Sequence, residues 1–183
     1  MIPDPLYWAW QKEIPESVCD AIIAEGKKLE LSDGVVSPER KKNKDIRESQ
    51  VGWFPNTKWV AGIMRHYMML ANYQAWKFNL SVLEAPQFTI YNTGGFYEFH
   101  QDSPVRHDYL KPDGIRKLSC TITISDPKDY EGGQFEFKDG TIPDIRERGS
   151  ILVFPSFLDH RVTPVTSGTR YSLVAWHEGP KFI

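Results

Sequence analysis

The pattern of hydrophobic and polar positions changes character once along the chain, at about residue 85. Before that point, apolar residues recur every three to four positions, which is the period of a helix with one buried face. After it, apolar and polar residues alternate in short runs, as in strands with one buried face. The sequence therefore predicts a single domain over 1–183, with helical support over about 1–84 and a β core over about 85–180.

Two helices are expected in the first half of the chain. One begins at Pro15-Glu16-Ser17 and ends near Gly26, and a polar stretch over 31–50 follows it. The stronger helical pattern follows Asn56, whose side chain can cap the helix, and its apolar stripe is typical of a core face. The stripe consists of Trp59, Val60, Ile63, Met64, Tyr67, Met68, Ala71, Ala75 and Phe78.

Short alternating runs in the second half predict strands, separated by turns rich in glycine, asparagine, aspartate and proline. Many short strands with such turns are typical of an antiparallel sandwich or jelly roll, with the early helices packed outside one sheet. The predicted strands are Gln87–Tyr91, Tyr97–Asp102, Leu118–Ser125, Gln134–Lys138, Ile151–Phe154, Asp159–Pro164 and Arg170–Trp176.

Composition narrows the classes of partner. A net charge of −2 gives no basic field for nucleic acid or for an acidic membrane surface, so neither partner is expected. No apolar run reaches the length of a membrane span, and the first residues lack the pattern of a secretory signal. Cys19 and Cys120 lie in apolar stretches and are expected to be buried thiols, so we expect a cytoplasmic protein.

A histidine and a carboxylate share one face of a predicted strand. His100 and Asp102 are two residues apart, so their side chains project from the same face, about 7 Å apart along the strand. An imidazole and a carboxylate suit Fe(II), and a third protein ligand leaves positions open for other molecules. The triplet alone is equally well explained by a surface histidine beside a turn-forming aspartate.

His160 is the best candidate for the third ligand. It opens a late strand, which barrel closure can bring beside the strand that carries His100. The other histidines are less well placed: His66 lies within a helix, His107 in a loop, and His177 after the last strand. A structural hydrogen bond is the alternative role for His160.

An arginine follows His160 by ten residues. Arg170 and Ser172 share one face of the last strand, together with Val174 and Trp176. A guanidinium can bind a carboxylate through two parallel hydrogen bonds, and a serine hydroxyl can add a third donor. The alternative, a solvated strand arginine, is less natural on a face with two large apolar neighbours.

Five motifs, taken together, resemble the catalytic core of prolyl 4-hydroxylase-like 2-oxoglutarate/Fe(II) dioxygenases, including PKHD-type bacterial and phage members. They occur in the family's order and spacing and span about half of the chain. The motifs are Tyr91–Asp102, Tyr130–Phe135, Arg148–Pro155, His160–Val162 and Gly168–Ser172.

The resemblance implies a mainly β fold with α support (α+β), a cupin-like jelly roll or double-stranded β-helix with N-terminal helices packed on one sheet. It implies that 2-oxoglutarate is decarboxylated to succinate while a C–H bond is hydroxylated with O2. His100, Asp102 and His160 match the family's iron ligands. Fe(II), 2-oxoglutarate and O2 are thus the expected cofactor and cosubstrates, with ascorbate as a candidate reductant.

The resemblance also suggests a cosubstrate pocket. Arg170 matches the residue that binds the distal carboxylate, where many prolyl 4-hydroxylases carry lysine and PKHD-type members arginine. Tyr91 matches a tyrosine that often contacts the cosubstrate, and Trp176 an aromatic near the metal. The remaining candidates are Ser172, Thr123, where some relatives have a tyrosine, and Phe135, for which simple core packing is the alternative.

Four residues are candidates for substrate contact. Arg47 and Trp53 lie in a segment that resembles the one approaching the target in relatives; a solvated loop charge and a core anchor are the respective alternatives. Arg106 and Arg116 lie in the segment Ser103–Arg116, which follows the metal triplet and is expected to overhang the same mouth.

The first functional hypothesis is a hydroxylase of a peptidyl residue such as proline, and it rests on analogy with the family. Hydroxylation of a free amino acid or another small molecule is the second. A non-catalytic jelly-roll binding module and a cupin-like metalloenzyme without 2-oxoglutarate are the alternatives of other classes. The presence of Asp102 argues against a halogenase, since in those enzymes a halide occupies the position of the carboxylate ligand.

Overall fold

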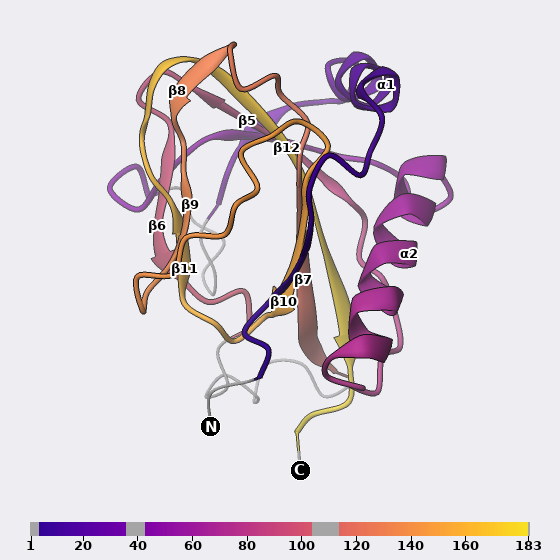
Figure 1. Cartoon of the computed structure of the whole chain (residues 1–183). Coiled ribbons are helices and arrows are strands. Elements are labelled where there is room, and N and C mark those ends of the chain that lie inside the picture. Colours follow the sequence, from indigo (N-terminus) through magenta and orange to yellow (C-terminus); the bar gives the residue numbers. More distant parts are fainter. Residues whose placement is uncertain (1–3, 36–42, 104–113, 183) are drawn as a thin grey trace.

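The computed structural model of the protein describes residues 4–35, 43–103 and 114–182. Two antiparallel sheets face each other, and two helices cover the outer face of the larger sheet (Figure 1). The eight-stranded sheet has the order β1 (Trp8–Trp10), β10 (Ile151–Pro155), β7 (Ile115–Thr123), β12 (Val165–Gly179), β5 (Gln87–Asn92), β4 (Gln50–Trp53) and β2 (Ser32–Asp33), with β8 (Tyr130–Gly132) paired to β12. The four-stranded sheet has the order β3 (Arg47–Glu48), β6 (Phe96–His100), β11 (His160–Val162) and β9 (Phe135–Phe137).

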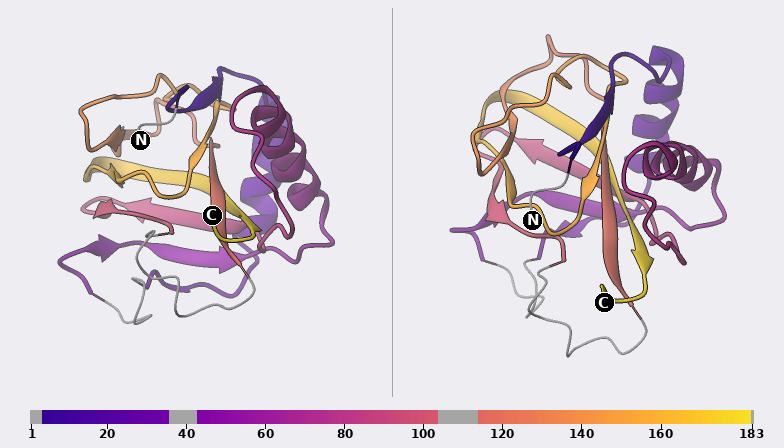
Figure 2. Two further views of the ribbon diagram at one scale, coloured as in Figure 1. Left: turned by 90° about the horizontal axis from the view of Figure 1, so that it is seen from below. Right: turned by 60° about the horizontal axis from the view of Figure 1, so that its bottom comes forward.

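The helices α1 (Glu16–Gly26) and α2 (Trp59–Gln74) lie on the side of the large sheet away from the small one, as both views of Figure 2 show. The largest apolar cluster fills the space between these helices and the sheet. Met64 and Met68 of α2 belong to it, together with Leu118, Cys120 and Ile122 of β7. The predicted helical support on one sheet is therefore confirmed.

The alternation along β7 separates the core from the interior between the sheets. Leu118, Cys120 and Ile122 are fully buried in the cluster beneath the helices. Ser119 and Thr121 point the opposite way, because successive side chains alternate across a strand. The hydroxyl-bearing face of β7 thus looks toward the small sheet, where the candidate site lies.

Most predicted elements are present, with changes at their ends. All seven predicted strands occur, although β6 ends at His100, two residues before Asp102, and β12 extends on both sides of its predicted range. Five short strands were not predicted: β1, β2, β3, β4 and β8. They have two to four residues, too few for alternation to stand out, and three of them lie wholly or partly in the polar stretch over 31–50.

The predicted cap of the second helix is wrong. Lys58 occupies the N-cap position of α2 and forms no side-chain cap bond, whereas Asn56 donates its amide to the Leu83 carbonyl oxygen at 3.2 Å. Ala75 and Phe78 lie beyond the last helical residue, although Phe78 still packs against the core.

Cys19 and Cys120 are buried free thiols, as predicted. Among the described residues, no helix has both the length and the apolar character needed to cross a lipid bilayer.

Candidate metal centre and cosubstrate pocket

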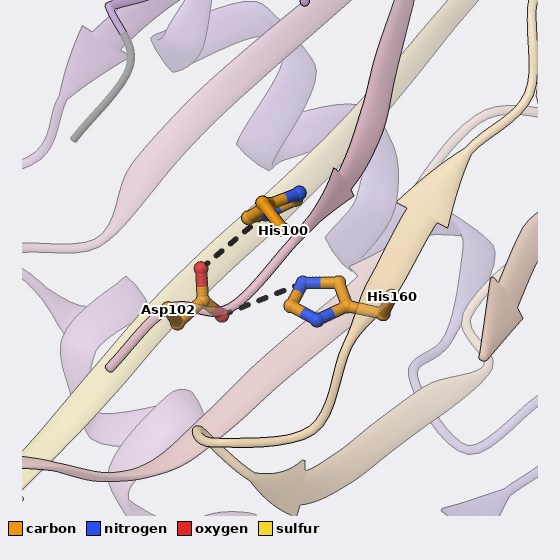
Figure 3. A group of neighbouring side chains, drawn as sticks. All are labelled: His100, Asp102 and His160. Atoms are coloured by element: carbon orange, nitrogen blue, oxygen red, sulfur yellow. Dashed lines mark ion pairs between the residues drawn. The ribbon is translucent and has the colours of Figure 1, made fainter. Parts of the chain in front are cut away.

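The structure brings His100, Asp102 and His160 together (Figure 3). Strands β6 and β11 are neighbours, and their register pairs His100 directly with His160. Asp102 follows the end of β6 and turns its carboxylate toward both rings, so that Oδ1 lies 3.5 Å from His100 Nε2 and Oδ2 lies 3.5 Å from His160 Nε2. One candidate ligand atom from each residue lies within 4.8 Å of the others, which is close enough to share an ion.

Backbone carbonyls hold both imidazoles in the same way. His100 Nδ1 lies 2.8 Å from the Glu98 carbonyl oxygen, and His160 Nδ1 lies 2.9 Å from the Leu158 carbonyl oxygen. A carbonyl oxygen only accepts, so each Nδ1 carries the proton, and each Nε2 presents a lone pair toward Asp102. Metal-binding histidines usually have such a partner on the second nitrogen.

The charge states suit a divalent cation. Burial disfavours the imidazolium and lowers the pKa of His160 to about 4, a shift that His100 increases and Asp102 opposes. Burial acts against ionisation of Asp102, but the two imidazoles and Arg116 outweigh it and hold the pKa of the carboxyl below its usual range. A neutral His160 and an ionised Asp102 therefore lie beside the His100 imidazole, and two imidazoles with one carboxylate are a donor set that fits Fe(II).

Two serine hydroxyls that were not predicted as site residues lie beside Asp102, and one of them contacts it. Ser119 Oγ lies 2.6 Å from Asp102 Oδ2 and 2.9 Å from Ser156 Oγ. Both serines are buried, and they come from β7 and from the residue after β10. The alternation of apolar and hydroxyl residues along β7 turns Ser119 toward the small sheet, but nothing in the local sequence pairs it with Asp102.

A cavity of about 390 Å³ adjoins the three residues. It is lined by all three candidate ligands and by nearly all other predicted site residues. These are Arg170, Tyr91, Ser172, Phe135 and Trp176 among the predicted cosubstrate residues, and Arg47, Trp53 and Arg116 among the predicted substrate residues. Arg106 lies outside the described residues.

Arg170 is a buried cation without an anionic partner. Its residue is 3% exposed, so it is not a solvated strand arginine. In the described part of the chain its guanidinium forms no hydrogen bond or ion pair, and its only aromatic neighbour is the Tyr91 ring, 5.6 Å away. Since an unpaired buried charge is costly, this guanidinium is suited to receive an anionic ligand.

Thr123 lies apart from the other cosubstrate candidates. It pairs with Ser172 across β7 and β12, but it is not among the residues that line the cavity beside the ligands. It lines a second cavity of about 460 Å³, which shares Arg170 and Phe135 with the first. Thr123 therefore shares a cavity with Arg170 but not with the three candidate ligands.

An aromatic and charged cluster forms one wall of the first cavity. Arg116 lies 3.9 Å from the centroid of the Trp176 ring and binds both carboxylate oxygens of Glu84, at 2.5 and 2.7 Å. Trp53 lies beside Trp176, with 6.2 Å between ring centroids. Trp176 Nε1 is fully buried and has no hydrogen-bond partner in the described chain, so it is a free donor.

Arg47 is not a solvated loop charge, and Trp53 is not a core anchor, so both alternatives to a role at the site are wrong. Arg47 is 8% exposed rather than solvated; it donates to Ser49 Oγ at 2.8 Å and lies 4.5 Å from the Tyr97 ring. That ring stacks on His100, with 3.5 Å between centroids. Trp53 is 45% exposed, so it is not a core anchor.

Two imidazoles and one carboxylate in an antiparallel β sandwich are typical of non-haem iron oxygenases. The chain belongs to the 2OG-Fe(II) oxygenase superfamily, whose family model matches residues 86–178. The predicted family is thus confirmed.

Curated relatives match the same half of the chain. A PKHD-type hydroxylase of Pseudomonas fluorescens is 38% identical over 94 residues, which cover 50% of this chain and 42% of the relative. The PKHD-type hydroxylase PiuC of Pseudomonas aeruginosa is 36% identical over 94 residues, with the same coverage. The matched region spans less than half the length of these relatives.

Solved structures match nearly the whole fold. A viral collagen prolyl hydroxylase of Paramecium Bursaria Chlorella virus-1 has a TM-score of 0.73 and 19% identity, and the match covers 95% of this chain and 96% of that one. A prolyl-4-hydroxylase of Pseudomonas putida has a TM-score of 0.67 and 23% identity, with coverages of 95% and 92%. These likenesses support the predicted jelly roll with helical support.

Proposed function

We propose that this chain is a hydroxylase that depends on Fe(II), 2-oxoglutarate and O2. One observation carries the proposal: three convergent metal-ligand side chains and a buried guanidinium without a partner in the described chain line the same cavity. A metal site alone would suit many metalloenzymes. A metal site beside an unsatisfied buried cation calls for a ligand that binds the metal at one end and carries an anion at the other.

We assign the metal to His100, Asp102 and His160. The hydrogen bonds at Nδ1 leave a lone pair on each Nε2, and one ligand atom from each of the three residues lies within 4.8 Å of the others. Fe(II) held there supplies the activation of O2 that oxidises 2-oxoglutarate and a substrate C–H bond. The protein's own part is to fix these donors and to bind and orient the two organic molecules.

Arg170 is assigned to the distal carboxylate of 2-oxoglutarate. Its planar fork offers two parallel donors, and the burial that makes an unpaired guanidinium costly makes the paired one strong. Ser172 lies two residues along the same strand face and Tyr91 lies beside the guanidinium, so both can contact the same ligand. Phe135 stacks near His160, with 5.3 Å between centroids, and closes the cavity with an apolar wall.

The substrate is assigned to the wall formed by Trp53, Trp176 and Arg116. We favour a peptidyl residue such as proline, since the relatives and structural neighbours are hydroxylases and prolyl hydroxylases. One structural neighbour is a prolyl hydroxylase from Trichoplax adhaerens in complex with a peptide fragment of hypoxia inducible factor. A free amino acid or small molecule remains the second candidate, because a cavity of about 390 Å³ accommodates either together with the cosubstrate.

Two further assignments accompany the proposal. A reducing, cytoplasmic setting suits the two buried free thiols and would keep iron ferrous. Ascorbate is assigned as an accessory reductant by analogy with the family.

A succinate-release assay tests the proposal. The purified protein is incubated with Fe(II), 2-oxoglutarate and O2 in the presence of a panel of proline-containing peptides and free amino acids. The masses of the products are then measured by mass spectrometry. We expect substrate-dependent succinate and a gain of one oxygen in a peptide. Gain of oxygen in free amino acids alone would favour the second candidate, and the absence of succinate with every substrate, in metal-loaded folded protein, would contradict the proposal.

A further inference from the structure

Asp102 lies beside the two histidines of its own sheet, but its shortest hydrogen bond comes from the opposite sheet. The strand that carries His100 ends at that residue, so Asp102 lies past the last ladder position of the small sheet. Its carboxylate instead contacts Ser119, which is in the middle of β7 in the large sheet. The carboxylate of one metal-ligand candidate therefore accepts a hydrogen bond from a side chain of the opposite sheet.

The direction of the hydrogen bonds in this contact is determined by the carboxylate. An ionised carboxylate only accepts, so Ser119 donates its one hydroxyl proton to Asp102 Oδ2, at 2.6 Å. Its oxygen, 2.9 Å from Ser156 Oγ, is then left to accept, and Ser156 must donate to it. The result is a chain from Ser156 through Ser119 to Asp102, with both serines at most 1% exposed and shielded from competing water.

Ser156 is itself fixed by the backbone on both sides. Its N–H donates to the Lys117 carbonyl oxygen at 3.0 Å, on the same strand as Ser119. Its carbonyl oxygen accepts from the Ser103 N–H at 3.0 Å, one residue after Asp102. Ser156 thus anchors both the hydroxyl that holds the carboxylate and the backbone that follows the carboxylate.

We propose that Ser119, oriented by Ser156, is a positioning residue that presets the Asp102 carboxylate for a divalent metal ion. The inference rests on the proposed metal site and adds the groups that orient it. Without the Ser119 donor, the Asp102 side chain is free to adopt other rotamers, and the ion must select the binding conformation. Loss of such supporting hydrogen bonds typically weakens metal binding about 10- to 100-fold.

The test measures Mn(II) binding to the metal-free protein by isothermal titration calorimetry, and so needs no turnover. We expect Ser119→Ala to raise the Kd for Mn(II) about 10- to 100-fold. Ser156→Ala should raise it less, since Ser119 keeps its donor but loses the group that orients it. The visible spectrum of the Co(II)-loaded protein should change in both variants, because the ligand arrangement changes.

Ser125→Ala is the matched control. Ser125 is also 1% exposed and lies two residues after the end of β7, and its hydroxyl accepts from the Tyr171 N–H at 2.6 Å. Its loss should lower the unfolding temperature of the metal-free protein without changing the Kd for Mn(II). A purely structural role for Ser119 would give that same result.

The outcomes separate this inference from the function it rests on. If the wild type binds Mn(II) and folded Ser119→Ala binds it with the same Kd, the positioning role of Ser119 is overturned and the metal site is not. If Ser119→Ala does not fold, an unchanged Kd and an unchanged Co(II) spectrum in Ser156→Ala would overturn it. No binding of Mn(II), Co(II) or Fe(II) by the folded wild type would overturn the metal site and this inference together.

Discussion

Replacing Arg170 with methionine should weaken the binding of 2-oxoglutarate without lowering the stability of the fold. The guanidinium is buried, has no anionic or hydrogen-bonding partner in the described chain, and lines the cavity beside the three candidate ligands. Methionine keeps an unbranched side chain of comparable length and removes only the charge and the donors. The two properties should therefore respond in different ways to this one change.

The size of the effect on affinity follows from the hydrogen bonds that a guanidinium forms with a carboxylate. A bidentate pair provides two charge-assisted hydrogen bonds, and removing both costs about 3–4 kcal/mol, or about a 100- to 1,000-fold rise in Kd. The effect on stability should have the opposite sign. Because an uncompensated buried cation destabilises a protein, metal-free Arg170→Met should unfold at a temperature no lower than the metal-free wild type.

The assay is 2-oxoglutarate binding to Mn(II)-loaded protein by calorimetry, with the KM for 2-oxoglutarate from succinate release. Arg148→Met is the control, because Arg148 already binds Asp20 and the Ile124 carbonyl oxygen and does not line the cavity. It should leave the Kd unchanged and lower the unfolding temperature. A Kd for 2-oxoglutarate within about threefold of wild type in Arg170→Met, a difference of about 0.7 kcal/mol at most, would refute the assignment of Arg170.

Three further predictions follow from the same structure. Asp102→Ala should abolish succinate formation while the circular dichroism spectrum stays that of the wild type; full turnover would refute Asp102 as a ligand. Gly133→Ala should raise the KM for 2-oxoglutarate, because Gly133 has a φ of 61° and an added Cβ would lie 2.8 Å from Arg170 Cδ; an unchanged KM in the folded variant would contradict this. Since burial lowers the pKa of His160 from 6.5 to about 4, the folded metal-free protein binds fewer protons than the unfolded chain between these values and should lose stability as the pH falls through this window. Thermal unfolding of the metal-free protein against pH measures this, and His160→Asn should remove a part of the slope; an identical slope in the variant would count against the buried neutral imidazole.

Local periodicity was sufficient to predict the architecture. The alternation over Leu118–Ser125 correctly divides β7 into a core face and a hydroxyl face, because burial on one side of a sheet is recorded residue by residue. The long apolar stripe of α2 was equally informative. The short strands were not predictable in this way, since β2 and β3 have only two residues each and exist through pairing with distant strands.

The candidate site was predictable where its residues lie close together in the sequence, although Asp102 lies past the end of β6. His100 and Asp102 are two residues apart, and Arg170 shares a strand face with Ser172. Contacts between elements far apart in the sequence were not: Ser119 meets Asp102 across the two sheets, and Arg116 meets Glu84 at a separation of 32 residues. Such contacts depend on how the sheets close, which no local pattern encodes.

Anaerobic titration of the protein with Fe(II) and 2-oxoglutarate, followed by visible absorption, tests the central proposal most directly. A keto acid bound to ferrous iron gives a metal-to-ligand charge-transfer band, and it forms only if one cavity holds both. We expect the band in the wild type, its loss in Asp102→Ala, and its appearance only at much higher 2-oxoglutarate concentration in Arg170→Met. Folded wild-type protein that gives no band with saturating Fe(II) and 2-oxoglutarate would contradict the proposal and favour a non-catalytic binding module or a metalloenzyme that does not use 2-oxoglutarate.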